Sequence, residues 1–108
     1  ELKFKEFDLA SFGTIGLENV WGVLSQYTTV ERAVTLLTSA RKRFGIPTAP
    51  IAENTEADVT IFTPEGETVF TKEMILSASK NSAFIGATMK GKVLGIIAHR
   101  QAILNDGV

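Results

Sequence analysis

The chain has 108 residues, of which 44% are hydrophobic and 21% charged, and its formal net charge is −1 at pH 7. This length predicts a single domain over residues 1–108, and this composition excludes wholesale disorder. Dedicated nucleic-acid-binding domains usually have an isoelectric point above about 9, so the near-neutral charge balance argues against nucleic acid as a partner.

The sequence contains no cysteine, which excludes disulfides, thiolate chemistry and cysteine-built metal sites. Its longest apolar run, residues 93–98, is far shorter than the roughly 20 residues that cross a bilayer. We therefore expect no membrane contact and a cytoplasmic or virion location.

The first third of the chain predicts a strand and a helix. Alternation over residues 2–9 indicates a strand with a bulge in its middle. Apolar residues then recur at helical spacing from Leu17 to Tyr27 and predict a first helix over 17–26. Gly22 inside this helix costs about 1 kcal/mol relative to Ala, so packing by Trp21 and Leu24 has to offset it.

Residues 28–47 give the clearest single element, an amphipathic helix with a start and a stop signal. Thr28 followed by Glu31 predicts a capping box. Gly45 suits the left-handed position after a helix, and Pro47 prevents continuation. The apolar face of this helix consists of Val30, Ala33, Val34, Leu37, Ala40 and Phe44.

The remainder of the chain predicts mostly strands. In chain order, we expect a loop over 48–56, a strand over 57–63, a turn at 63–66, a return strand over 68–71, a short helix over 72–80, a strand over 83–89, a two-residue turn at Lys90–Gly91 and a long strand over 93–104. The fold class is therefore α+β: a helical pair packed on a mostly antiparallel sheet of four to five strands.

Three groups of residues are candidates for sites of chemistry. Residues 86–93, GATMKGKV, nearly match a phosphate-binding loop, but Val93 replaces the hydroxyl residue and a strand follows, so a hairpin is preferred. His99 suits a general base, although a hydrogen-bonded structural histidine fits the end of a strand better. The carboxylates of Glu53, Glu56 and Asp58 lack a calcium-loop pattern and indicate a solvated acidic loop. We expect no catalytic residue, metal or cofactor.

The strongest candidate for binding is the basic end of the second helix, Arg41, Lys42 and Arg43, followed by Phe44. Cations here complement the helix dipole, which explains them without a partner. The alternative is a docking site for an anion or a protein, with Phe44 as an apolar anchor. The acidic middle of the chain and its basic end also suit association with other protein subunits or with copies of the same chain.

Residues 17–25, LENVWGVLS, together with Arg43-Phe44-Gly45-Ile46 and Pro50-Ile51, resemble the opening of the small baseplate-wedge or sheath-initiator family of phage and contractile tails. The resemblance covers about a third of the chain. It implies a non-enzymatic assembly part that docks through strands and a basic surface.

These observations predict a non-catalytic assembly or protein-interaction module, a phage virion or tail component. Two alternatives remain open. One is a small ligand-binding or regulatory domain with a pocket between helices and sheet, and the other is a small enzyme that uses His99 within a concave site.

Overall fold

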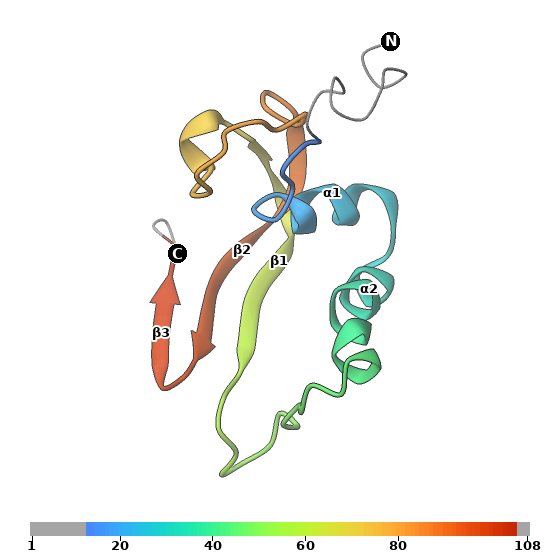
Figure 1. Cartoon of the computed structure of the whole chain (residues 1–108), viewed down its shortest axis with the longest axis vertical. Helices are drawn as coiled ribbons and strands as arrows, with labels where there is room; N and C mark the ends of the chain where they lie inside the picture. Colours follow the sequence, from blue (N-terminus) through green and yellow to red (C-terminus); the bar gives the residue numbers. More distant parts are fainter. Residues whose placement is uncertain (1–12, 106–108) are drawn as a thin grey trace, which may run out of the picture.

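The computed structural model describes residues 13–105, which form two helices, a short 3-10 helix and one antiparallel sheet (Figure 1). The sheet has the strand order β1-β2-β3. This arrangement confirms the α+β class, whereas the described residues hold three strands rather than four to five. The strand expected over residues 2–9 lies outside the described residues. The elements are α1 (Val20–Tyr27), α2 (Val30–Arg43), β1 (Val59–Val69), η3 (Lys72–Met74), β2 (Thr88–Ala98) and β3 (Gln101–Leu104).

Strands β1 and β2 run antiparallel along their whole lengths, and this overturns both predicted turns. The register passes from Thr63 opposite Lys92 to Glu67 opposite Lys90, so residues 64–66 form an irregularity inside one strand rather than a hairpin. The Pro and Gly that signal a turn here interrupt the ladder without reversing the chain. Lys90 and Gly91 likewise lie within β2, because β1 pairs with residues on both sides of them.

The reversal of the chain occurs later, at His99 and Arg100, between β2 and β3. Both residues have positive φ, 51° and 62°, as a two-residue hairpin turn that matches strand twist requires. The predicted strand over 93–104 is therefore two strands. This turn was missed because its usual signal is Asn-Gly or Asp-Gly, whereas here two residues with large side chains adopt the left-handed conformation.

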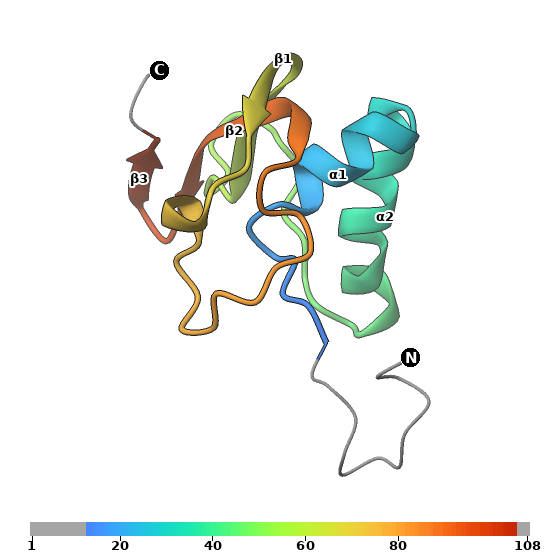
Figure 2. The same ribbon diagram turned by 90° about the horizontal axis from the view of Figure 1, so that it is seen from above.

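Helix α1 packs on β2. Figure 2 shows that α1 and α2 lie on the same side of the sheet. The contact is close because Gly22 faces Met89: a Cβ on Gly22 would lie 2.8 Å from the Cβ and Sδ atoms of Met89. Gly22 lowers the helix propensity of α1, but its missing side chain is what allows the helix to lie this close to the sheet. Helix α1 starts at Val20, three residues later than predicted.

The core is small. Its buried cluster is Phe70, Ile75 and Met89, against which Val23 and Phe84 also pack. The segment between β1 and β2 supplies two of these three side chains, although the helix predicted over 72–80 is reduced to η3 and the rest is irregular. No helix within residues 13–105 is long and apolar enough to cross a membrane.

Candidate functional site

The start of α2 uses a different threonine from the one predicted. The Thr29 hydroxyl accepts a hydrogen bond from the backbone N–H of Arg32 at 3.3 Å, so Thr29 is the N-cap. The N–H of Thr28 instead donates to the carbonyl of Leu24 and closes the last turn of α1. Hydrogen bonds from its own backbone N–H and then from Thr29 lower the pKa of the Glu31 carboxyl. The sequence placed the cap one residue early because two threonines stand side by side.

The end of α2 follows the prediction closely. Gly45 has φ +64°, and its N–H donates to the carbonyl of Lys42 at 3.4 Å. The N–H of Ile46 donates to the carbonyl of Arg41 at 2.9 Å. This pair of bonds is the Schellman arrangement, which satisfies carbonyls that the helix leaves free.

The four residues predicted to form a binding site do not share one environment. The Arg41 guanidinium lies 3.0 Å from the carboxylate of Asp58, the residue before β1, and the two side chains are 41% and 54% exposed. Lys42 and Arg43 are exposed, and neither belongs to an ion pair within residues 13–105. Phe44 caps the helix with its side chain 77% exposed. Whether these residues bind a partner stays a prediction.

The sole histidine lies at the tip of the β2–β3 hairpin, where it is exposed. A hollow of about 410 Å³ lies beside this turn; its wall includes Arg100, Glu56 and Ile97, but His99 is not part of it. A second hollow of about 80 Å³ lies within residues 49–59. Neither hollow lies between the helices and the sheet, where a ligand-binding domain was expected to have its pocket.

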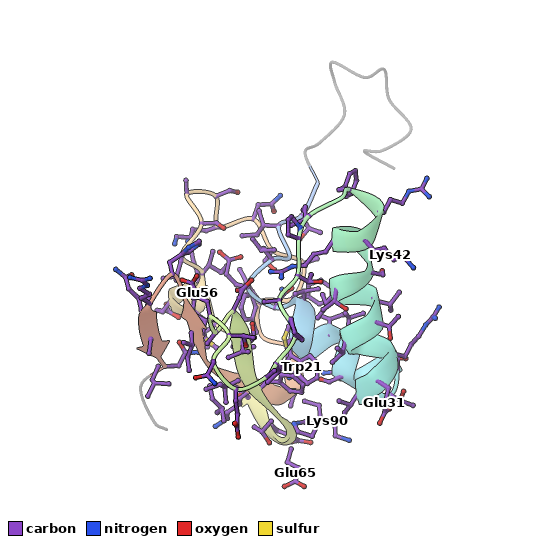
Figure 3. The ribbon with its side chains drawn as sticks, turned by 90° about the horizontal axis from the view of Figure 1, so that it is seen from below. Trp21, Glu31, Lys42, Glu56, Glu65 and Lys90 are labelled. Carbon is purple, nitrogen blue, oxygen red and sulfur yellow. The ribbon has the colours of Figure 1, made fainter. Side chains whose placement is uncertain are left out.

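The acidic segment contains ion pairs rather than a cation site. Asp58 is engaged by Arg41, and a Glu56 carboxylate oxygen lies 4.0 Å from the Arg100 guanidinium. Across residues 13–105, no three His, Cys, Asp or Glu side chains are arranged to hold a metal ion. Glu56, labelled in Figure 3, therefore lies beside the β2–β3 hairpin through its pairing with Arg100.

Residues 86–93 do not form a phosphate-binding loop. The segment from Thr88 onward is strand β2, and up to residue 105, where the described part of the chain ends, no helix follows it. The N–H of Gly86 is used in a hydrogen bond to the carbonyl of Phe70 at 2.8 Å. Backbone donors committed to a neighbouring strand or loop are not free to cradle a phosphate.

A close junction between α1 and the sheet was missed as a unit by sequence reasoning. The Trp21 indole N–H donates to the Thr63 carbonyl at 3.3 Å, and its ring lies 4.1 Å from that of Phe62, centroid to centroid, at 49°. Gly91 makes room for this arrangement: a Cβ there would lie 2.6 Å from the Thr63 oxygen and 2.9 Å from the indole nitrogen. Figure 3 shows Trp21 between α1 and the sheet.

A second missed contact joins the start of α1 to the segment after η3. The Glu18 carboxylate accepts hydrogen bonds from the backbone N–H of Ser77 at 2.8 Å and from the Ser77 hydroxyl at 2.5 Å. The hydroxyl and then the backbone bond from Ser77 lower the pKa of the Glu18 carboxyl. A separation of 59 residues leaves no local pattern by which the sequence could signal this pair.

Much apolar surface stays open. Five hydrophobic side chains are buried among the described residues, and the large side chains exposed by at least 38% are three times as many. Single exposed hydrophobic residues are ordinary on proteins, whereas contiguous apolar patches are typical of surfaces that another polypeptide covers. The most exposed of these side chains are Leu17, Tyr27, Phe44, Ile51 and Leu76.

The chain is similar to curated proteins named dihydroorotase. It is 37% identical to the dihydroorotase of Endomicrobium trichonymphae over 99 residues, which is 84% of this chain and 24% of that protein. It is 32% identical to the protein from Chlorobaculum tepidum over 90% of this chain, and 29% identical to the one from Bacillus subtilis over 99% of it. The chain spans about a quarter of the length of these relatives. No protein-family model and no solved structure matches it.

These relatives correct the resemblance to baseplate-wedge or sheath-initiator proteins, and with it the expected role as a non-catalytic phage virion or tail component. The similarity to dihydroorotases extends over most of the chain, whereas the tail-protein resemblance used about a third of it. The helix and Phe-Gly pattern that carried the resemblance is common to many helix ends, because dipole complementation and a glycine cap recur wherever helices terminate.

Proposed function

We propose that this chain forms the helix-and-sheet portion of a dihydroorotase-type enzyme and serves dihydroorotate chemistry by completing the fold of that larger enzyme. The observation that carries the proposal is the extent of the similarity: matches of 27–37% identity run over 82–100% of this chain but over only 22–27% of each relative. A portion that matches nearly end to end is expected to fold in the same way in each relative. Cytoplasmic location is part of the same proposal.

The open apolar surface supports this role. A chain whose core consists of Phe70, Ile75 and Met89 with a few neighbours gains limited stability from its own burial, at roughly 25 cal/mol per Å² of apolar surface removed from water. Packing against a larger body would bury side chains such as Leu17 and Ile51, which are 84% and 91% exposed. The gain would come without changing the elements described above.

The test is an exchange of segments. The part of the Endomicrobium trichonymphae dihydroorotase that aligns with this chain is replaced by the chain, and consumption of dihydroorotate is measured. The same host with the segment deleted is the control. We expect the chimera to turn over dihydroorotate within about tenfold of the host, which corresponds to about 1.4 kcal/mol in the activation barrier, and the deletion to be inactive.

The same exchange is made in the Chlorobaculum tepidum and Bacillus subtilis proteins. This separates a general failure from one caused by a poor fit at the points where the segment joins a single host. A chimera that folds cooperatively in all three hosts without consuming dihydroorotate would contradict the proposal. So would failure to fold in all three, because the proposal states that this chain can supply the missing part. Activity of the deletion control at the host's rate would also contradict it, since the segment would then be dispensable.

A further inference from the structure

Helix α2 has one buried residue, Ala33, and exposes most of its other apolar side chains. Ala33 in its first half is fully buried, whereas Leu36 and Leu37 are 48% and 43% exposed and Phe44 at the cap is 77% exposed. Ala40 lies between them and is also exposed. These four apolar residues, Leu36, Leu37, Ala40 and Phe44, are called the α2 stripe below, and Arg43 lies along its edge.

Helical geometry places the members of the α2 stripe together. At 100° per residue, Leu36, Ala40 and Arg43 follow one another along one side, and Leu37 and Phe44 form the adjacent row. Ala40 lies at the centre, where a small side chain lets another backbone approach closely. Lys42 leaves the helix about 160° away from Ala40, since two residues subtend 200°. Figure 3 shows Lys42 on the side of α2 that also carries Glu31.

The two flanks of the α2 stripe differ in charge. On one flank, Arg41 is already neutralised by Asp58 at 3.0 Å. On the other, Arg43 is exposed and belongs to no ion pair in the part of the chain that the structure describes. An uncompensated guanidinium beside an apolar stripe matches an apolar surface that carries a carboxylate at its edge.

We infer that the α2 stripe docks an amphipathic helix from the remaining part of the dihydroorotase-type enzyme, with Ala40 at the crossing point and an acidic side chain on Arg43. The inference rests on the proposed function, which leaves about three quarters of such an enzyme outside this chain. Helices that meet at small side chains approach to about 8 Å, and a stripe of four apolar residues suits such a crossing. The acidic edge fixes the orientation of the partner helix.

The test compares two neighbouring substitutions in the active chimera, Arg43→Glu and Lys42→Glu. Both reverse one charge in the last turn of α2, so both lose the same interaction with the helix dipole. We expect Arg43→Glu to lower the melting temperature of the chimera by about 5 °C or more and Lys42→Glu by less than about 2 °C. Phe44→Glu is expected to act like Arg43→Glu, and Arg43→Lys is expected to retain most of the stability.

The same variants of the unfused 108-residue chain, also followed by melting temperature, separate docking from internal effects. Because Phe44 is 77% exposed, we expect Phe44→Glu and Arg43→Glu to lie within about 2 °C of Lys42→Glu there. A drop of the same size in the unfused chain as in the chimera would overturn the inference, because the residues would then act within this chain.

The remaining outcomes each have one meaning. If the parent chimera is active and Arg43→Glu equals Lys42→Glu, the inference fails while the proposed function stands. If the parent chimera is inactive in every host, the proposed function fails and the docking surface falls with it. If the unfused chain forms a dimer that Phe44→Glu dissociates, the α2 stripe belongs to a second copy of the chain, and the inference is overturned.

Discussion

The α1–sheet junction and the C-terminal half of α2 show two ways of using a helix. At the junction, Gly22 and Gly91 remove side chains so that Trp21 reaches the Thr63 carbonyl and α1 lies directly on β2. At the end of α2, apolar side chains are present but lie open, and the contact that holds the helix is a half-exposed ion pair. The α1–sheet junction is packed by residues of this chain alone, whereas the α2 stripe is left exposed by this chain.

The contrast has a physical consequence for substitutions. Where atoms are in van der Waals contact, adding one methyl group forces neighbours to move, since protein interiors are packed as densely as organic crystals. Where side chains face solvent, the same change costs little. Substitutions of matched chemistry in the two regions therefore measure how complete each one is.

The largest effect is expected from Gly91→Ala. Gly91 has φ +76°, and a Cβ there would lie 2.6 Å from the Thr63 oxygen. We expect a loss of about 3–4 kcal/mol in the free energy of unfolding, measured by urea denaturation, from the left-handed conformation and the overlap together. Gly66→Ala is the matched control, because Gly66 has φ +84° with open space around it, and it should lose only about 1–2 kcal/mol. Equal losses would mean that the junction is not tightly packed.

A smaller effect is expected at the first turn of α2, which precedes the one buried residue of this helix, Ala33. Thr29→Ala removes the hydroxyl that accepts from the Arg32 N–H and should cost about 1 kcal/mol of unfolding free energy. Thr28→Ala should cost less than about 0.5 kcal/mol, because its backbone N–H, not its hydroxyl, bonds to Leu24. The reverse order in denaturant titrations would restore Thr28 as the cap.

Local signals predicted the C-terminal end of α2 well, its N-cap one residue early, and the sheet poorly. Gly45 and the basic last turn act within a few residues of sequence, so the pattern suffices to locate the end of the helix. The meaning of Pro64, Gly66 and Gly91 depends on what lies opposite them, and that is decided by pairing between β1 and β2 some thirty residues apart. A turn signal that meets a continuous partner strand becomes an irregularity in the ladder.

The candidate site shows the same limit. Sequence singled out Arg41, Lys42, Arg43 and Phe44 as one group because they are consecutive. In the folded helix, Arg41 turns to Asp58, while the side chains of Lys42 and Phe44 point about 160° apart around the helix axis. The hydrophobic pattern identified Leu37 and Ala40 as part of an apolar face, but periodicity does not report whether this chain itself covers that face.

A pH-dependent effect is expected just before α1, where the Glu18 carboxylate accepts hydrogen bonds from Ser77. The bonds from Ser77 depress the pKa of Glu18 below its ordinary 4.5, so their contribution to stability is present above that value and is lost as the pH falls through the depressed pKa. Ser77→Ala should bring the pKa of Glu18 back toward its ordinary value and reduce the fall in unfolding free energy between about pH 5 and about pH 3. Unfolding curves recorded across this range provide the measurement. An unchanged pH profile would mean that the Glu18–Ser77 contact does not persist in solution.

The smallest effect is expected from Arg41→Ala, and its size decides how open the end of α2 is. Half-exposed ion pairs contribute up to about 1 kcal/mol, and salt screens them, so the loss should stay below about 1 kcal/mol and shrink further in about 1 M salt. Asp58→Ala should give the same loss, and the double variant should cost no more than either single one, as expected for one shared interaction. A salt-independent loss above about 2 kcal/mol would instead show that Arg41 packs its aliphatic stem against the 49–58 segment. The end of α2 would then be held by this chain itself, and only the side of the helix that carries Leu36 and Arg43 would be left for a partner.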